Sequence, residues 1–239
     1  MELKEMIGRR KSVRGYTAQP VDEATLAEIK AFIEQMKPLD SALRVGWEIV
    51  PSSQVKCILP WKAPQLVAIY AEDKEGGLEN AGFLFQQLDL YLQGRGIGTC
   101  WLGMGKPEQS LAAKDGLPFC MLLAFGYPKE PAQRERVEEF KRKALANIAD
   151  RPDTRLEPAR LAPSSVNSQP WYFTHEGDMI HVWRVAPTGL MRRGMEKMNR
   201  IDMGIALAHL YVSNPDTFRF FREEQPARKG YVYTGSIEL

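Results

Sequence analysis

A basic segment near the start of the chain, Arg9–Arg14 (RRKSVR), is the first group of residues whose types and spacing suit binding chemistry. On a helix, Arg10 and Arg14 lie one turn apart on the same face. Lys11 lies beside them, and Ser12 adds a hydroxyl. Arginine presents a planar fork of donors that matches phosphate oxygens. The segment predicts either a phosphate-binding site or a solvated basic face, which is the commoner outcome for an isolated cluster.

A polar loop later in the chain is the second candidate. It lies within Leu161–Phe173 (LAPSSVNSQPWYF), where two prolines bracket small polar side chains. The second proline favours an extended conformation at the residue before it. Hydroxyls and side-chain amides can bond backbone groups or the polar edge of a flat heteroaromatic ligand. The residues concerned are Pro163, Ser164, Ser165, Asn167 and Gln169. An ordinary Pro/Ser/Asn turn is the alternative interpretation.

Two further segments are weaker candidates. In Gly96–Gly103, small residues let backbone N–H groups approach a ligand closely, although a helix stop explains these glycines more simply. The stretch 184–200 gathers positive charge that could meet the phosphates of a nicotinamide cofactor. We favour a solvated helix start for this stretch, whose basic residues are Arg184, Arg192, Arg193, Lys197 and Arg200.

Composition and charge exclude several classes of protein. Of the 239 residues, 44% are hydrophobic and 26% are charged, with a net charge of +2. This composition is ordinary for a soluble globular protein. The small net charge argues against a nucleic-acid partner. No apolar run reaches the length of a membrane span, and the charged start lacks the apolar core of a signal peptide. We therefore expect a cytoplasmic protein without a membrane partner.

The cysteines and histidines predict no metal site. The three cysteines are widely spaced without a CxxC motif, which is typical of reduced thiols: Cys57, Cys100 and Cys120. The three histidines lack the spacing of metal ligands: His175, His181 and His209.

Hydrophobic periodicity predicts the elements that must position these residues. Helices are expected over 2–14, 22–37, 81–92, 133–148 and 200–212. Strands are expected over 45–50, 66–71, 119–125, a hairpin in 171–185, 218–222 and 230–237. The segment 81–92 is apolar nearly all round, which is typical of a buried helix.

A weak internal repeat connects the two parts of the chain. Aligning Gly204 with Gly82 pairs Asp202 with Asn80, and a helix followed by two strands is then expected twice. No clean linker separates the parts. We expect residues 1–239 to form one domain of two intertwined halves, about 1–150 and 151–239.

Together, RRKSVRGY, LAPSSVNSQPWYF and AGFLFQQLDLYLQGRGIGTCWLG followed by GLPFCMLLAFGYP resemble the FMN-dependent nitroreductase family. The resemblance implies an α/β (α+β) sandwich of a mixed, mainly antiparallel sheet with helices on both faces, and a tightly held FMN. It implies that the phosphate and ribityl end of FMN are held by Arg10, Lys11, Ser12 and Arg14. It places along the isoalloxazine Pro163, Ser164, Ser165, Asn167 and Gln169. Leu102 and Gly103 are implied to give backbone contacts near the redox edge.

The order of these motifs departs from the usual family pattern, in which the serine motif closely follows the arginine cluster. Ordinary members are homodimers whose flavin lies at the subunit interface. This chain resembles the single-chain, duplicated subgroup, in which each half supplies one of the two motifs. Val50–Lys56 (VPSSQVK) resembles a poor second copy of the serine motif. We therefore predict one FMN per chain at the junction of the halves, in a monomer that mimics the family's dimer.

The activity implied by the resemblance is NAD(P)H-dependent reduction. NADH or NADPH supplies the hydride, FMN carries it, and a nitroaromatic, quinone or similar acceptor receives it. Such chemistry requires no side chain as an acid or base, so we predict no catalytic residue. A non-enzymatic FMN-binding or storage protein on the same fold is the alternative. Flavin dismantling or dehalogenation needs lid residues that the sequence does not identify.

Overall fold

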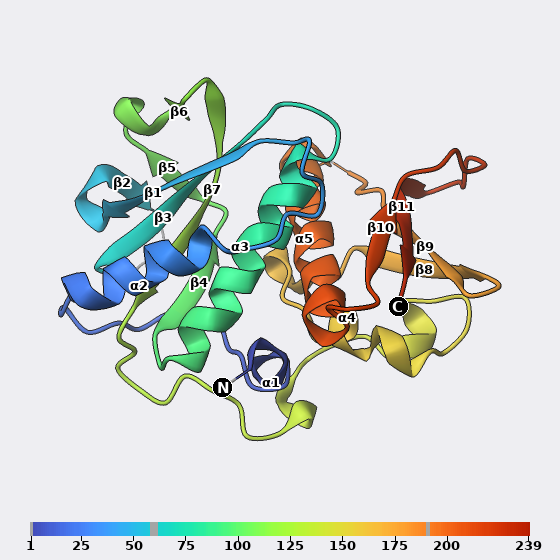
Figure 1. The fold of residues 1–239 in the computed structure, drawn as a ribbon, viewed down its shortest axis with the longest axis horizontal. Helices are drawn as coiled ribbons and strands as arrows, with labels where there is room; N and C mark the ends of the chain where they lie inside the picture. The colour runs from blue at the N-terminus through green and yellow to red at the C-terminus, as the bar shows by residue number, and fades with distance from the viewer. Residues whose placement is uncertain (1, 58–61, 190–191) are drawn as a thin grey trace.

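Two sheets flank a central pair of long helices. The computed structural model describes residues 2–57, 62–189 and 192–239. The central helices are α3 (Gly77–Gly94) and α5 (Arg192–Ser213), and buried apolar residues of both belong to one core cluster. In Figure 1 one sheet lies to the left of this pair and the other to the right. The chain therefore has the predicted α+β architecture.

The first sheet has the strand order β1-β3-β7-β4 and is antiparallel throughout. Its strands are β1 (Val45–Pro51), β3 (Gln65–Ala71), β7 (Leu117–Gly126) and β4 (Gly98–Leu102). The two inner strands, β3 and β7, are continuous apolar runs because both faces of the sheet are covered there. Short strands complete this half: β6 (Ala113–Lys114) pairs with β7, and β2 (Val55–Cys57) pairs with β5 (Gly105–Pro107).

The second sheet repeats this connectivity with the order β10-β11-β9-β8. Its strands are β8 (Trp171–Glu176), β9 (Met179–Val185), β10 (Arg219–Phe221) and β11 (Tyr231–Glu238). The predicted hairpin is β8 and β9, joined at Gly177, whose φ of 59° suits a residue without a Cβ. In each half, two main strands precede the long helix and two follow it. When these four strands are numbered in chain order within each half, the spatial order in both sheets is first, second, fourth and third.

The two long helices cross where each has a glycine. A Cβ on Gly82 would overlap the carbonyl oxygen of Ile201, and a Cβ on Gly204 would overlap that of Glu79. The two glycines are the pair aligned in the sequence, and the contacts that they make are reciprocal. Close approach of the backbones at this point lets apolar residues of both helices join a single core cluster.

Equivalent polar residues of the two helices brace equivalent loops. The Asn80 side chain accepts hydrogen bonds from the backbone N–H groups of Leu39 (2.9 Å) and Asp40 (3.2 Å), in the loop before β1. Asp202 accepts from the N–H of Ser165, in the loop before β8. The loop before β8, residues 162–170, is called the serine loop below. The loop before β1 is thus its counterpart. The interpretation of Val50–Lys56 as a second copy is wrong, because that segment begins within the end of β1, whereas the serine motif precedes β8.

The segment joining the halves crosses from one sheet to the other. After β7, the chain reaches the outer edge of β8, where Phe173 donates to the carbonyl of Ile148 (2.8 Å) and accepts from the N–H of Asp150 (3.0 Å). Ala149 and Phe173 form a parallel bridge there. Residues 127–150, which join β7 to the edge of β8, are called the connector below. The helix expected over 133–148 is wrong, because the connector is held extended between its contacts. It contains only the 3-10 turns Val137–Glu139 and Leu145–Asn147.

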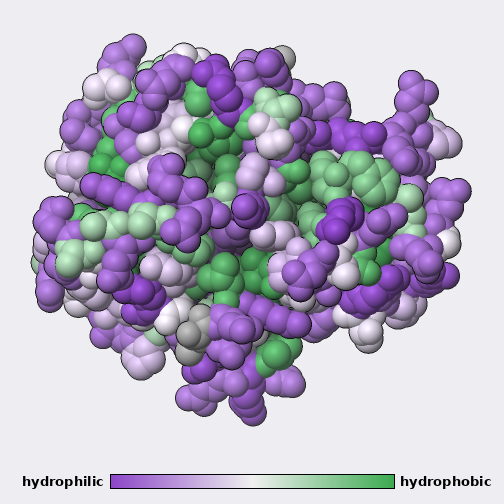
Figure 2. Space-filling view, viewed as in Figure 1, coloured by the Kyte–Doolittle hydropathy of each residue, from purple (hydrophilic) through white to green (hydrophobic). Residues whose placement is uncertain are grey.

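The remaining helices are short. The helix expected over 2–14 ends early, because α1 covers Leu3–Ile7 and the next residues join the edge of β4. Helix α2 (Glu23–Ile33) begins as predicted after Asp22, which accepts from the N–H of Thr25 (3.0 Å). Helix α4 covers Glu157–Leu161, and further 3-10 turns cover Ser52–Gln54, Gln109–Leu111, Thr154–Leu156 and Ser165–Asn167. Hydrophilic side chains cover most of the face shown in Figure 2.

Candidate functional site

A cavity of about 330 Å³ lies between the two halves and brings the two predicted motifs together. From the first half it is lined by Ser12, Arg14, Cys100, Trp101, Gly103, Met104 and Met121. From the second half it is lined by Pro163, Ser164, Ser165, Val166, Gly194, Met195, Met198, Ile201, Asp202 and Ile205. Six predicted site residues therefore share one cavity: Ser12, Arg14, Gly103, Pro163, Ser164 and Ser165. Its wall is mainly apolar, with few charged groups.

The serine loop is held against α5 by its second serine. The N–H of Ser165 donates to both carboxylate oxygens of Asp202 at 3.1 Å, and the Ser165 hydroxyl donates to Sδ of Met198 at 2.9 Å. Within the loop, the N–H of Gln169 donates to the hydroxyl of Ser164 at 2.9 Å. The loop consequently presents its first residues to the cavity in a fixed conformation.

The same loop carries three non-glycine residues with left-handed backbones. The φ angles of Val166, Asn167 and Gln169 are 46°, 57° and 48°. Asparagine visits this region readily, whereas for an ordinary L-residue it costs about 1–2 kcal/mol. Val166 is the costliest of the three because its side chain is β-branched. Backbone strain of this kind gathers at functional sites.

Asn167 and Gln169 face the connector rather than the cavity. Arg142 donates to Oδ1 of Asn167 at 2.7 Å, and Nδ2 of Asn167 donates to the carbonyl of Lys141 at 2.8 Å. The side-chain oxygen of the buried Gln169 accepts from the N–H of Lys143 at 2.7 Å. These two amides therefore tie the serine loop to the connector, and their place in the site is indirect.

The basic segment is extended, so Arg10 and Arg14 diverge. Arg14 lines the cavity, whereas Arg10 is 1% exposed and its Nε lies 2.8 Å from Oδ2 of Asp89 on α3. The helical spacing that placed both on one face is wrong, because Val13 donates to the carbonyl of Thr99 (2.8 Å) and the segment lies along β4. Lys11 is exposed, and its backbone N–H donates to the side-chain oxygen of Gln93 at 2.9 Å.

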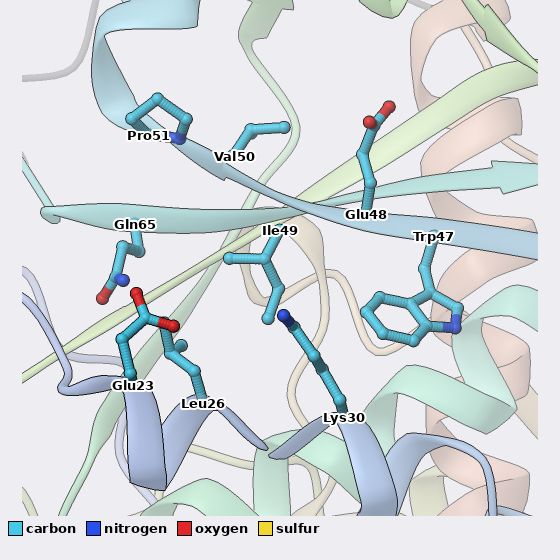
Figure 3. A pocket seen from close by; sticks show the side chains of 9 residues that line it. All are labelled: Glu23, Leu26, Lys30, Trp47, Glu48, Ile49, Val50, Pro51 and Gln65. Atoms are coloured by element: carbon cyan, nitrogen blue, oxygen red, sulfur yellow. The ribbon is translucent and has the colours of Figure 1, made fainter. Parts of the chain in front are cut away.

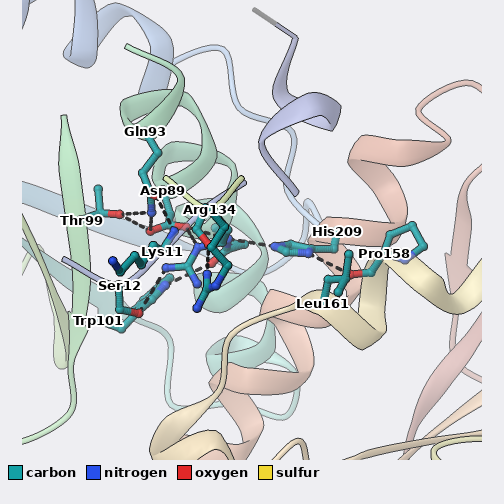
Figure 4. Close-up of polar contacts among 12 residues, drawn as sticks. Lys11, Ser12, Asp89, Gln93, Thr99, Trp101, Arg134, Pro158, Leu161 and His209 are labelled. Carbon is teal, nitrogen blue, oxygen red and sulfur yellow. Dashed lines mark hydrogen bonds and ion pairs between the residues drawn. The ribbon is translucent and has the colours of Figure 1, made fainter. Parts of the chain in front are cut away.

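The Arg10–Asp89 ion pair belongs to a buried network that joins both long helices (Figure 4). Gln86 donates to Asp89 (2.9 Å) and accepts from the indole N–H of Trp101 (3.1 Å), which lines the cavity. Gln86 also lies 3.0 Å from Nε2 of His209 on α5. The other ring nitrogen of His209 donates to the carbonyl of Pro158, since that oxygen can only accept. Burial lowers the pKa of His209 to about 3, so the ring is neutral.

Two arginines of the connector lie near this segment and were not predicted from the sequence. Arg134 donates to the carbonyl oxygen of Arg10, and Arg142 holds Asn167. Burial, followed by the charges of Arg10, Arg134 and Arg160, lowers the pKa of Arg142 to about 10. Its buried Nε has no hydrogen-bond partner among the residues described. This concentration of positive charge suits an anion. The charged composition of the connector is the available signal, but its pattern predicts a helix.

Asp202 is a buried carboxyl group in the cavity wall. Its residue is 4% exposed, and burial raises its pKa to about 8, against the opposing hydrogen bond from Ser165. The group is therefore mainly protonated near neutral pH. Of the remaining predicted residues, Leu102 is buried in the core beside the cavity, while Gly103 reaches the cavity itself. A Cβ on Gly103 would lie 2.9 Å from the terminal methyl group of Met198, so this flexible side chain would have to shift.

Two other hollows contain none of the predicted flavin-site residues. One of about 460 Å³ lies between α2 and β1, and in Figure 3 the side chain of Lys30 extends from α2 towards the strand. The other, of about 380 Å³, lies at the start of α3 against the second sheet. Its position corresponds to that of the cavity between the halves, which lies at the start of α5 against the first sheet. The hollow at the start of α3 contains two ion pairs, Glu79 with Arg200 (2.9 Å) and Arg184 with Glu196 (2.5 Å).

These ion pairs also show what two arginines of the basic stretch 184–200 contact. Arg184 and Arg200 are paired with carboxylates, and Lys197 donates to the carbonyl of Phe119 at 3.4 Å. The side chains of Arg192 and Arg193 lie outside the described part of the structure. Within residues 2–57, 62–189 and 192–239, no helix has both the length and the apolar character needed to cross a membrane. No cluster of potential metal ligands occurs in the same ranges.

Comparison with known proteins gives one sequence family. The profile of the family described as Putative TM nitroreductase matches residues 2–214. Among curated proteins, none matches the sequence.

Comparison with solved structures gives the same fold. A putative nitroreductase from Thermotoga maritima is 22% identical with a TM-score of 0.70, over 100% of this chain and 94% of its own. A nitroreductase family protein from Clostridium difficile is 16% identical with a TM-score of 0.51, over 62% of this chain and 96% of its own. A nitroreductase with bound FMN from Bacteroides fragilis is 16% identical, over 57% of this chain and 93% of its own. Its TM-score is 0.47.

Proposed function

The chain belongs to this nitroreductase family, and from that premise we propose that it binds one FMN in the cavity between its halves. In this proposal it passes reducing equivalents from NADH or NADPH to a nitroaromatic, quinone or similar acceptor. The observation that carries the proposal is the meeting of Ser12 and Arg14 with Pro163, Ser164 and Ser165 in one cavity. These residues come from opposite halves of the chain, and their convergence is independent of the motif comparison.

The residues of the cavity fit an FMN. Apolar side chains and the glycine at 103 leave a wall against which a flat ring can lie. Arg14 supplies a cation at the cavity, and the nearby Arg134 and Arg142 add positive charge on its connector side. Arg142 does not line the cavity itself, but its buried Nε has no hydrogen-bond partner among the residues described, and we propose it as a donor for the phosphate end. We assign the phosphate to this side and the ring to the apolar wall.

Bound FMN supplies the hydride chemistry, and the protein's own residues bind, orient and shield it. The hydroxyls of Ser164 and Ser165 give polar contacts at the edge of the cavity, and Asp202 fixes the loop that carries them. The apolar wall excludes water from the reacting face. In this arrangement no side chain acts as an acid or a base.

The equivalent place in the other half supports one flavin per chain. We propose that the halves, about 1–150 and 151–239, are pseudo-repeats, because they share strand order, the reciprocal glycine crossing and the braced loops. At the start of α3, the ion pairs of Glu79 with Arg200 and of Arg184 with Glu196 occupy the region that corresponds to the cavity. A flavin ring there would have to displace paired charges.

The stoichiometry can be measured from the absorption spectrum of the purified protein, with the flavin quantified after release by heat. We expect one FMN per chain in a protein that elutes as a monomer. Half an FMN per chain would mean a site shared between two chains and would remove the composite-site proposal. A colourless protein that takes up no added FMN would remove the flavin function.

A matched pair of variants tests the phosphate end. Arg14→Gln is expected to weaken FMN binding roughly tenfold to a hundredfold, because a charge-assisted contact contributes about 1.5–3 kcal/mol. Arg9→Gln removes an exposed arginine that does not line the cavity and should leave the FMN affinity unchanged. Fluorescence titration of the flavin-free proteins measures both. Equal affinities of the Arg14 variant and the parent would contradict the assignment.

A non-enzymatic FMN-binding or storage protein needs the same contacts and is the second candidate. Reduction of the bound flavin discriminates between the two. An oxidoreductase bleaches its flavin absorption under anaerobic NADH or NADPH, and an added quinone restores it. A storage protein keeps its oxidised spectrum with either donor.

A further inference from the structure

Val166 is a costly residue at its position, and packing does not account for it. Its backbone is left-handed, at φ 46° and ψ 24°, where glycine or asparagine fits with less strain than a β-branched residue. Yet the side chain is 83% exposed, so it buries almost no apolar surface in return. The bonds of Ser165 to Asp202 explain why the loop turns here, but they do not explain the choice of valine.

Val166 lies at the cavity, and an exposed methionine from the other half lies there too. Met104 follows β4 and is 50% exposed, although both it and Val166 line the same hollow. Exposed apolar side chains that flank a largely apolar cavity indicate contact with a ligand. Met121, Met195 and Met198 line the same hollow and extend its apolar surface. Methionine adapts its shape to varied apolar partners.

We propose that Val166 and Met104 form an apolar clamp at the mouth of the cavity that selects flat, apolar electron acceptors. The clamp rests on the proposed flavin function, because the acceptor must reach the bound cofactor. Val166 is then a specificity-determining residue, and its backbone strain persists because the side chain contacts the acceptor. Small, highly charged acceptors gain nothing from these two side chains.

The variant Val166→Asn separates this role from a structural one. If the valine serves the acceptor, the variant should be more stable but bind the acceptor less well, whereas if the valine serves the fold, the variant should be less stable. Asparagine accepts the left-handed backbone, so the melting temperature should rise by about 1–3 °C. At the same time it removes the two methyl groups from the clamp. The KM for menadione, a flat apolar quinone, should rise about fivefold to tenfold relative to the KM for ferricyanide, with FMN still bound.

Two further variants complete the experiment. Val137→Asn changes an exposed valine on the connector, outside the cavity, and should leave the ratio of the two KM values unchanged. Met104→Gln should raise the ratio as Val166→Asn does, without the gain in melting temperature.

The outcomes distinguish failure of the clamp from failure of the flavin function. FMN-loaded Val166→Asn and Met104→Gln proteins with the parent's KM ratio would remove the clamp alone. A Val166→Asn protein that melts lower than the parent would show that the valine serves the fold, and would also overturn the proposal. A parent protein that binds no FMN, or keeps its flavin oxidised with NADH and NADPH, would remove the function on which the clamp rests.

Discussion

At the scale of single residues, Asp202 combines a structural and an electrostatic role. It braces the serine loop through the N–H of Ser165, and it is a carboxyl group removed from water. Burial favours its neutral form, which is why its pKa rises to about 8. Folding therefore takes up a proton at this residue when the pH lies between the ordinary pKa of 3.8 and about 8.

The sign of the resulting pH dependence follows from linkage. Below the ordinary pKa of 3.8, Asp202 is protonated in both the folded and unfolded states and imposes no penalty. Between that value and about 8, the unfolded state has lost the proton and the folded state has kept it, so the free energy of unfolding falls by about 1.4 kcal/mol per pH unit. Above both values the penalty is constant.

The variant Asp202→Asn tests this dependence. Asparagine keeps a carbonyl oxygen for the Ser165 N–H but cannot ionise. We expect its advantage in the free energy of unfolding to grow between about pH 5 and about pH 8, as measured by urea unfolding of the flavin-free protein. Asp178→Asn, in the exposed hairpin turn, is the control and should follow the parent. Parallel curves for the parent and Asp202→Asn would contradict the prediction.

Residue-scale prediction from sequence succeeded where a side chain's neighbours are local and failed where they are distant. Pro163, Ser164 and Ser165 were predicted as one loop and lie together in the cavity. Arg10 was grouped with Arg14, but its partner is Asp89 on α3, and no pattern along the chain indicates that buried pair. Asn167 was expected at the ligand and instead bonds the connector.

At the scale of elements, the crossing of α3 and α5 determines how the halves fit. At Gly82 and Gly204 the backbone of each helix lies close to a carbonyl group of the other helix. A Cβ atom at either position would overlap that carbonyl oxygen. The buried Arg10 network and His209 lie along the same pair of helices. The cavity is formed by the N-terminal part of α5 and the edge of the first sheet, so its shape depends on this crossing.

Substitution at the crossing should therefore be costly. Intrinsic helix propensity favours alanine over glycine by about 1 kcal/mol. Despite this, we expect Gly82→Ala and Gly204→Ala each to lower the free energy of unfolding by about 2 kcal/mol or more, because the helices must move apart. Gly94→Ala, on the same helix α3, meets only Met6 at ordinary contact distance and should be neutral or slightly stabilising. Urea unfolding measures all three, and a stable Gly82→Ala protein would show that the backbones do not meet here.

Elements with strong apolar patterns were predictable, and the connector was not. The inner strand β7 and the helix α3 follow from continuous apolar runs, and both are confirmed. The segment 133–148 has a helical charge pattern, yet its arginines bind residues distant in sequence and its backbone pairs with β8. Tertiary contacts overrode the local pattern, because the chain must span the molecule at this point.

At the scale of the whole molecule, the two sheets share one continuous core. A single cluster of buried apolar residues includes Val67 of β3, Leu88 of α3, Ile205 of α5 and Val182 of β9. The connector adds a second tie, because residues that follow β7 cover the edge of β8. This shared core lies between the two sheets, while the first sheet also packs against a second cluster of its own half, which includes Leu66 and Leu122.

Unfolding should consequently be a single cooperative event. Native-state hydrogen exchange should give the amides of β7 and β9 the same free energy of opening, equal to the global free energy of unfolding from urea. If the amides of one sheet open at a lower free energy while the other stays protected, the halves would be separate folding units. That result would contradict the shared core.

Asn80 and Asp202 occupy equivalent places but are different amino acids, one a neutral amide and one a titratable acid. In a symmetric homodimer a single codon specifies both such positions, so every substitution is expressed twice and must suit two environments at once. A chain that carries both halves is released from that restriction. One place can accumulate the ion pairs of Glu79 with Arg200 and of Arg184 with Glu196 while the other keeps its serine loop. In the proposed pseudo-repeat, divergence within one gene can thus specialise one pocket without damaging its counterpart.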